Sequence, residues 1–484
     1  MIVTASLMRW YAACERHVWL TAHGGELPRD LPTAGARYRL AEGARHEAAL
    51  LRATTPGLAP VPVRDWDDGV MQTRRLMQAG AGVIVGACLE MALTFDGLDA
   101  PVIVRGAVDR LERAAVDGPP LYRPIEIKHA RVAQAADWLQ LDTYLWLLKQ
   151  IQGAAPAGEL WLGQAVDGAP AARVHRDLDE AAFVEVLGAV VRLLADADAE
   201  PDVVIAPHCK RCPWYTACRQ DAEARHDVGV LSGLRRETRE QFAREGIVTL
   251  DQIRAMDADT LLTFRHVGKK TVHAFKAQAE AYLQDRPLWY GPLPDVCREP
   301  GWFFDIETDP YNGGRVWSIG WCWHTDDVRI AIVAPRAQPG DVELPDGRRI
   351  TLVPDADAAW RALAESVSRN EQPIYHWTGF DAGNMRQHAS EVYARLGGRL
   401  HDLHASFKGA VTLPDRSTSL KVVAPYAGFH WQGYEDWMQA FTDYQRFLRA
   451  RSGEALAAAC AYQADDVTAM VYVWEWLIKT SDEV

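Results

Sequence analysis

Apolar and polar positions alternate along the chain with two different periods, and together they predict a mixed α/β protein. Period-two runs indicate strands, and patterns that repeat every 3.6 residues indicate helices. The strand-like runs lie at 102–108, 121–128, 159–166, 302–306, 316–323 and 329–334. The helical patterns lie at 135–150, 178–194 and 229–286. The last three strand-like runs precede an alternation of helices and strands, which predicts a sheet with antiparallel leading strands.

Turn-rich polar breaks near 219–229 and 286–300 divide the chain. The length of 484 residues allows about three domains at ~150 residues each. We therefore expect domains at 1–228, 229–295 and 296–484.

The composition is typical of a globular protein. The chain is 48% hydrophobic and 24% charged and contains 18 Trp, which argues against disorder and against a fibrous protein. No segment approaches the ~18 uninterrupted apolar residues that a membrane helix requires, and the start lacks a secretory signal, so we expect a cytoplasmic protein. The net charge of −13 does not exclude a polyanionic partner, because binding depends on where the positive charge lies.

Three of the eight cysteines are closely spaced. Cys209, Cys212 and Cys218 form a C-x2-C-x5-C pattern, and Cys14 is the candidate for a fourth thiolate. Four thiolates suit either a tetrahedral zinc ion or an iron–sulfur cluster, and the spacing does not choose between them. The pattern predicts a metal centre rather than disulfides, and this centre would tie the first helix to the end of the first domain.

Two acids and a lysine lie on neighbouring strand-like runs of the first domain. Asp109 follows the run 102–108, and Glu126 and Lys128 are two residues apart, so strand alternation places these two on one face. Two carboxylates beside a lysine can bind Mg²⁺ and hold the water that attacks a phosphodiester, while the lysine stabilises the developing charge. A Glu–Lys pair on the surface of an edge strand is the plain structural alternative.

Three more residues give this set a context. Gln140 and Tyr144 are four residues apart in a helical pattern and therefore share one face. His46 lies in a helical segment upstream, where a single histidine is more often an ordinary surface residue.

With the cysteines, these residues resemble the RecB-type nucleases of the PD-(D/E)XK superfamily, in the iron–sulfur branch that includes AddB and the CRISPR-associated adaptation nucleases. The resemblance covers about 1–220. It implies a [4Fe–4S] cluster on the four cysteines and Mg²⁺ or Mn²⁺ on Asp109 and Glu126, with His46 completing the metal shell. It also implies that Lys128 is the catalytic lysine.

The same resemblance implies that Gln140 and Tyr144 touch DNA or support the site. Val108 stands where the family pattern often has proline, a departure that does not change the chemistry inferred.

A second acidic pattern lies beyond residue 300. Asp305 and Glu307 share one face of an apolar strand-like run, and Asp381 follows a short one. Tyr462 and Asp466 are four residues apart on an apolar helix and lie on one side of it. Four carboxylates that converge would repel one another without cations, so we expect two metal ions about 3.5–4 Å apart. Solvated acids at strand and helix ends are the alternative.

The order of these motifs, an Asp-x-Glu strand, a Phe-Asp pair and a Tyr-x3-Asp helix, resembles the DEDD exonucleases of the ribonuclease H-like fold. The resemblance covers about 300–479 and is closest to the YprB-like branch found fused to RecB-like nucleases. It implies a catalytic role for Tyr462 and metal-ligand roles for the four acids. His376 stands where many relatives carry Asn, and Asp402 and Asp465 compete with the acids proposed. Because Asp465 points about 100° away from Asp466 around the helix, only one of them faces the site.

The middle block resembles a helix–hairpin–helix element, whose turn presents backbone N–H groups and lysines to a phosphate. The residues expected to contact DNA are Gly268, Lys269 and Lys270. His266 replaces the usual first hairpin glycine, which leaves Gly268 to form the turn. A plain helical linker is an equally good interpretation.

The expected fold class is α/β multidomain: a restriction-endonuclease-like (PD-(D/E)XK) domain, a small helical helix–hairpin–helix domain and a ribonuclease H-like domain. The resemblances imply a metal-dependent nuclease that hydrolyses DNA, exonucleolytically, in repair, recombination or defence, and they leave RNA open as a substrate of the C-terminal module. The sequence has no helicase motif, so a helicase or another repair or defence partner would have to supply any unwinding. The alternatives are a DNA-end or branched-DNA binding protein with vestigial sites and a structural metal cluster, and a zinc-stapled protein without nuclease activity.

Overall fold

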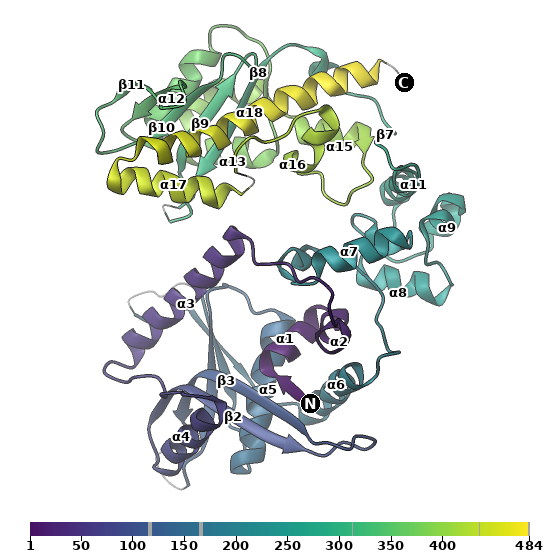
Figure 1. Cartoon of the computed structure of the whole chain (residues 1–484), viewed down its shortest axis with the longest axis vertical. Coiled ribbons are helices and arrows are strands. Elements are labelled where there is room, and N and C mark those ends of the chain that lie inside the picture. Colours follow the sequence, from purple (N-terminus) through teal and green to yellow (C-terminus); the bar gives the residue numbers. More distant parts are fainter. Residues whose placement is uncertain (115–118, 164–167, 312, 435, 483–484) are drawn as a thin grey trace. The chain divides into compact units, whose positions relative to one another are not determined.

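The chain builds two large β-sheets, each in its own compact unit of the backbone (Figure 1). The computed structural model describes residues 1–114, 119–163, 168–311, 313–434 and 436–482. The N-terminal unit consists of Met1–Pro32 and Ala36–Cys218, and the C-terminal unit consists of Thr33–Gly35 and Arg219–Val484. None of the helices in the described part of the chain is long and apolar enough to span a membrane.

The N-terminal unit has a six-stranded mixed sheet in which β3 is the longest strand. Its strands are β1 (Ile2–Thr4), β2 (Val83–Leu93), β3 (Val102–Arg113), β4 (Tyr122–Lys128), β5 (Gly158–Leu162) and β6 (Ala172–Arg176). Strand β3 pairs antiparallel with β2 along its length, parallel with β1 at its start and antiparallel with β4 at its end. The strand expected at 159–166 is observed as β5, which ends at Leu162. Residues 164–167 lie outside the described part of the chain.

Helices pack around this sheet, and one of them, α5 (Ala135–Gln152), is buried in the hydrophobic core of the unit. The other helices are α1 (Ala5–Ala13), α2 (Glu15–His23), α3 (Ala34–Thr54), α4 (Trp66–Gln78), α6 (Glu180–Ala195) and the short η1 (Pro207–Arg211). Helix α5 buries Leu141, Leu145 and Leu148 completely and packs against α1 and the sheet. It ends where Gly153 adopts a left-handed backbone conformation (φ +81°), a usual way for a helix to stop.

A glycine lets β3 approach α5. A Cβ atom at Gly106 would lie 2.5 Å from the Tyr144 ring, closer than non-bonded carbon atoms come. The glycine therefore allows Tyr144, which is 1% exposed, to point into the core beside the sheet.

A series of helices spans the boundary between the two units and the first part of the C-terminal unit. They are α7 (Tyr215–Ala224), η2 (Val228–Val230), α8 (Arg236–Arg244), α9 (Leu250–Ala255), α10 (Ala258–Leu262) and α11 (Lys269–Gln284). Residues 236–284 are mainly helical, as expected, but one turn differs from the prediction. His266 takes the left-handed conformation (φ +63°), whereas Gly268 has φ −107° as the N-cap of α11. The turn therefore depends on His266, whose Nδ1 lies 3.4 Å from an Arg235 nitrogen.

The C-terminal unit has a seven-stranded sheet in the order β11-β12-β10-β9-β8-β13-β14. Its strands are β8 (Trp302–Thr308), β9 (Val316–Cys322), β10 (Arg329–Val333), β11 (Gly340–Glu343), β12 (Arg349–Val353), β13 (Ile374–His376) and β14 (Leu400–Asp402), and β7 (Leu288–Trp289) pairs separately with β15 (Val411–Thr412). Strands β8, β9 and β10 are antiparallel, which confirms that prediction, and β13 and β14 continue in parallel with β8.

Helices line both faces of this sheet. They are α12 (Ala356–Val367), α13 (Gly379–His388), α14 (Ser390–Leu396), α15 (Leu403–Ala410), α16 (Leu420–Val423), α17 (Trp437–Ala450) and α18 (Gly453–Ser481), with short η3 (Asp295–Arg298), η4 (Gly397–Arg399) and η5 (Ala424–Ala427). Helix α18, drawn in yellow in Figure 1, contacts β8, β9 and β10. A Cβ atom at Gly320 would lie 2.8 Å from Gln463 and 2.9 Å from Val467, so this glycine lets α18 lie directly on β9.

Candidate functional site

The first acidic set lies where β3 and β4 separate. Asp109 Oδ2 accepts a hydrogen bond from the backbone N–H of Ile127 (2.7 Å), so the carboxylate is fixed against the neighbouring strand. Glu126 Oε1 lies 2.5 Å from Lys128 Nζ. Gln140 joins the pair: its Nε2 donates to Glu126 Oε1 (2.8 Å), and its Oε1 accepts from Lys128 Nζ (3.0 Å). The structure therefore brings the two acids, the lysine and Gln140 of α5 together.

Tyr144 supports this arrangement from one turn further along α5. Its hydroxyl accepts a hydrogen bond from Gln140 Nε2 at 2.8 Å. Both side chains are buried, and their role at the site stays a prediction.

Burial disfavours the charged form of both carboxylates, Asp109 and Glu126. Burial, and then the charges of Glu126 and Glu47, raise the pKa of Asp109. Burial also raises the pKa of Glu126 against the opposing effect of Lys128. Glu126 Oε2 is buried and has no hydrogen-bond partner among the described residues. A buried carboxylate oxygen without a donor suits a cation, so these residues fit a Mg²⁺ or Mn²⁺ ion.

Helix α3 contributes one residue that the sequence reasoning missed. Burial raises the pKa of Glu47, and so does the charge of Glu126, so this carboxylate belongs to the same electrostatic group. The expected residue, His46, precedes it; its ring centroid is 5.1 Å from that of His129, and burial lowers its pKa. The adjacent His-Glu pair was the signal available in the sequence.

The four cysteines line one cavity of the N-terminal unit. Cys14 lies at the α1–α2 junction and Cys209 in η1. Cys212 directly follows η1, and Cys218 lies in α7. Apolar side chains, among them Leu20 and Trp214, line the same cavity. Burial, and then the neighbouring thiols, raise the pKa of Cys212 to about 12. A nearby cation would be needed for such thiols to act as thiolates.

No three of these cysteines have sulfur atoms that all lie within 4.8 Å of one another in the described part of the chain. A tetrahedral zinc ion with Zn–S bonds of about 2.3 Å would hold its sulfurs about 3.8 Å apart. In the described part of the chain, the one group of three ligands with atoms within 4.8 Å of one another is acidic and lies elsewhere. The sequence reasoning missed His17, whose Nδ1 lies 3.3 Å from Cys212 Sγ and whose ring stacks on Trp10.

The second acidic set is in the C-terminal unit. Oxygen atoms of Asp305 and Glu307 on β8 and of Asp466 on α18 lie within 4.8 Å of one another. Asp381, in the first turn of α13, acts on Asp305 through its charge and is buried. Tyr462 lies one turn before Asp466 and is 4% exposed. The structure thus brings all five predicted residues to one region of the sheet.

Burial is the largest influence on each of these acids. It raises the pKa of Asp305 and Glu307, that of Asp381 to about 8 and that of Asp466 to about 6. Repulsion between the carboxylates adds to this effect. Cations would remove the repulsion, so the donor set fits divalent metal binding.

The neighbouring acid of α18 is directed elsewhere. Asp465 Oδ2 accepts a hydrogen bond from the backbone of Gln432 at 3.0 Å. Asp466 Oδ1 accepts from the indole of Trp431 at 2.6 Å. The other competitor, Asp402, caps α15 through a bond from Ala405 N (2.8 Å).

Three residues of this site were missed. Lys421 Nζ donates to the hydroxyl of Tyr462 (2.9 Å), Trp431 binds Asp466, and Gln463 Nε2 donates to Asp305 Oδ2 (2.8 Å). Lys421 and Trp431 lie in a stretch without a strong period, so only the folded chain identifies them.

The backbone beside Asp381 is unusual. Thr378 has φ +132°, a region in which residues with a Cβ are strained. Its carbonyl oxygen lies 2.6 Å from His376 Nδ1, and that nitrogen is 3.9 Å from Asp381 Oδ2. Such strain is found preferentially at functional sites.

The hairpin residues Gly268, Lys269 and Lys270 are exposed at the start of α11. Their contact with DNA stays a prediction.

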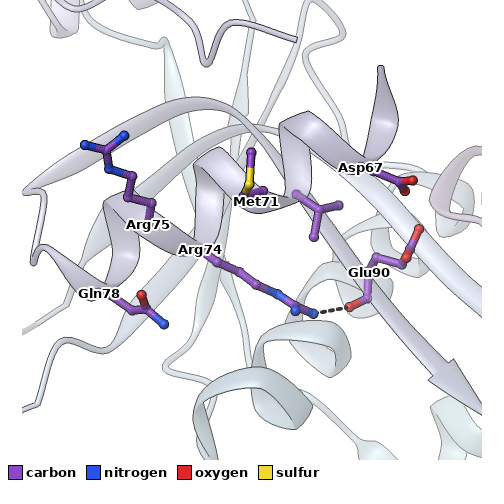
Figure 2. Close-up of a pocket in the computed structure, with 7 residues that line it drawn as sticks. Asp67, Met71, Arg74, Arg75, Gln78 and Glu90 are labelled. Carbon is purple, nitrogen blue, oxygen red and sulfur yellow. Dashed lines mark hydrogen bonds between the residues drawn. The ribbon is translucent and has the colours of Figure 1, made fainter. Parts of the chain in front are cut away.

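A groove of about 380 Å³ lies between α4 and β2 (Figure 2). Arg74, Arg75 and Gln78 line it together with Asp67 and Glu90, so its charge is mixed. None of the predicted site residues lines this groove.

Residues 8–219 match the PD-(D/E)XK nuclease superfamily, and residues 302–478 match the RNase H superfamily. The chain thus matches a PD-(D/E)XK nuclease superfamily domain in its N-terminal unit and an RNase H superfamily domain in its C-terminal unit. These matches confirm the expected fold class for the two large domains, and the helix–hairpin–helix domain stays a prediction. No curated protein matches the chain. A solved structure titled "Crystal structure of SSO0001" is similar at 15% sequence identity and a TM-score of 0.27, covering 45% of this chain and 85% of that one.

The pKa shifts of the second acidic set predict an unusual pH dependence of stability. Because folding raises the pKa of Asp381 to about 8 and that of Asp466 to about 6, the folded chain holds more protons than the unfolded chain between about pH 4 and 8. Without metal, the free energy of unfolding should therefore fall as pH rises through this window. Saturating Mn²⁺ should restore stability, and more at pH 8 than at pH 5.5, in calorimetric or fluorescence melts.

Asp305→Asn should flatten this pH dependence, since it removes one repelling charge. Asp357→Asn, at an exposed position in the first turn of α12, is the control and should leave it unchanged. Stability of the metal-free chain that rises with pH over this range would contradict the prediction.

Proposed function

We propose that the chain is a metal-dependent deoxyribonuclease with two separate catalytic sites, one in each nuclease domain. The observation that carries the proposal is that both domains bury mutually repelling carboxylates, and that one of the oxygens, Glu126 Oε2, has no hydrogen-bond donor in the described part of the chain. Mg²⁺ or Mn²⁺, when bound, would polarise the phosphodiester and a water molecule. We infer that the N-terminal domain is of the RecB-like type and the C-terminal domain of the YprB-like type.

In the first site, the acids would hold the cation and Lys128 would act on the phosphate. Lys128 is 17% exposed in its side chain and is held by Glu126 and Gln140, so its ammonium group is fixed at the edge of the site. There it can stabilise the negative charge that develops on a phosphate oxygen.

In the second site, Asp305, Glu307, Asp381 and Asp466 are proposed as metal ligands. The Tyr462 hydroxyl, buried beside them, would orient the attacking water. Because the order of these motifs resembles that of the DEDD exonucleases, we propose exonucleolytic cleavage.

A digestion assay tests this function. Full-length protein is incubated with strand-labelled single-stranded, duplex and flapped DNA and with RNA, with and without Mn²⁺. Lys128→Ala and Asp466→Asn should each remove one product pattern, by roughly 10²-fold or more in rate, while DNA binding stays close to normal. The double variant should be inactive.

Asp465→Asn is the matched control for Asp466→Asn, because its carboxylate faces the Gln432 backbone instead of the site. It should retain activity. DNA binding without metal-dependent cleavage by the unaltered chain would favour the alternative, a binding protein with vestigial sites.

We also propose a [4Fe–4S] cluster on the four cysteines. One observation supports it: the four thiols line a common cavity with an apolar wall. A cubane cluster is held by four thiolates, the number that this cavity offers. The cluster would join the α1–α2 junction to the end of the domain.

The purified protein should therefore be brown and contain about four iron atoms per chain. Cys14→Ser should lose iron and become less soluble, since the first helices lose their tie. Cys88→Ser, at a buried position on β2 of the same unit, should keep its iron. Stoichiometric zinc in metal analysis would refute the cluster.

A further inference from the structure

A lysine that no sequence motif identifies is held inside the second acidic site. Lys421 belongs to α16, a helix of only four residues whose Leu420 and Val423 are buried in the core of the unit. Its Nζ lies 2.9 Å from the Tyr462 hydroxyl and 4.2 Å from the centroid of the Tyr462 ring. Its position is therefore set by the core packing of α16 and by contacts that include the Tyr462 side chain.

The hydrogen bond between Lys421 and Tyr462 can be donated in one direction only. An ammonium group has three donors and no acceptor, so the Tyr462 oxygen accepts from Lys421. The phenol proton then points to another acceptor, and Asp466 lies one turn further along α18, on the side of the helix that carries Tyr462. The result is a directed chain from Lys421 through Tyr462 to Asp466.

Trp431 restrains both ends of this chain. Its indole N–H donates to Asp466 Oδ1 at 2.6 Å, and Lys421 Nζ lies 5.6 Å from the centroid of its ring. An ammonium at this distance from an indole face is attracted to it. The lysine is thus held between two aromatic side chains that both contact the same acid.

Resting on the proposed nuclease function of this domain, we propose that Lys421 is a positioning residue that fixes the rotation of the Tyr462 hydroxyl. With the phenol oxygen held by the ammonium group, the hydroxyl proton is directed toward the acid set and the water that attacks the phosphodiester. The proposal assigns Lys421 no contact with the substrate.

Two other roles make different predictions. A lysine that bound a substrate phosphate would act mainly on KM and would give a salt-dependent effect. A lysine that only offset the charge of Glu307 and Asp466 would act on metal affinity, because its removal would strengthen cation binding. A positioning lysine acts on kcat, and only while Tyr462 carries its hydroxyl.

The test is a double-mutant cycle in the full chain with the first site disabled by Lys128→Ala. In that background, Lys421→Met and Tyr462→Phe should each lower kcat by roughly 10- to 100-fold, with KM for a labelled oligonucleotide nearly unchanged. The double variant should be no slower than the slower single variant, since both changes remove the same oriented hydroxyl. Lys421→Arg, which keeps a charged donor, should recover much of the rate.

Lys479→Met, in the last turn of α18, is the control and should retain full activity. Thermal unfolding and the Mn²⁺ affinity of each variant are measured alongside, and Lys421→Met should leave the Mn²⁺ affinity unchanged, whereas tighter Mn²⁺ binding with an unchanged kcat would favour the charge-offset role. Effects of Lys421→Met and Tyr462→Phe that multiply, or a loss confined to KM, would overturn the positioning role. If the Lys128→Ala background has no activity that Asp466→Asn removes, the proposed nuclease function of this domain fails instead.

Discussion

Repulsion between buried carboxylates is the constraint on which both domains depend. A carboxylate loses hydration when it is buried, and a second one nearby raises the cost further. In the C-terminal unit, Asp305, Glu307 and Asp466 bring their oxygens within 4.8 Å of one another, and Asp381 adds a fourth charge. Such a group is tolerated when protons or cations neutralise its charge. At neutral pH a divalent cation does so better than protons, because it can bind several carboxylate oxygens at once.

The cores of the two domains are built to hold these groups in place. In the N-terminal unit, a buried helix carries Gln140 and Tyr144 beneath Glu126, and Gly106 makes the room that Tyr144 needs. In the C-terminal unit, Gly320 lets α18 lie on the sheet so that Gln463 reaches Asp305. In both units, side chains that are buried among apolar neighbours set the direction of polar groups at the site.

Much of this arrangement could be predicted, because it follows from short-range periodicity. Two-residue alternation put Asp305 and Glu307 on one face of β8, and helix geometry separated Asp466 from Asp465. The residues missed are those that reach the sites across long stretches of chain. Lys421 meets Tyr462 41 residues later, and no local pattern encodes that contact.

The hairpin shows another limit of sequence reasoning. Gly268 was expected to form the turn because glycine readily adopts left-handed conformations, yet His266 takes that conformation. Neighbouring contacts, such as the hydrogen bond from the Thr238 hydroxyl to the Arg265 carbonyl (2.8 Å), hold the turn in place. Tertiary packing therefore overrides the local preference at this position.

Calorimetric titration of Mn²⁺ into the full chain, in buffers of different ionisation enthalpy, tests the central claim most directly, since it measures both cation binding and the protons that binding displaces. The account predicts that Mn²⁺ binds in both domains at about pH 7 and releases protons. Asp109→Asn with Glu126→Gln should remove one part of the binding, and Asp305→Asn with Asp466→Asn the other. A chain that binds no Mn²⁺, or whose Mn²⁺ binding survives both pairs of substitutions, would contradict the account.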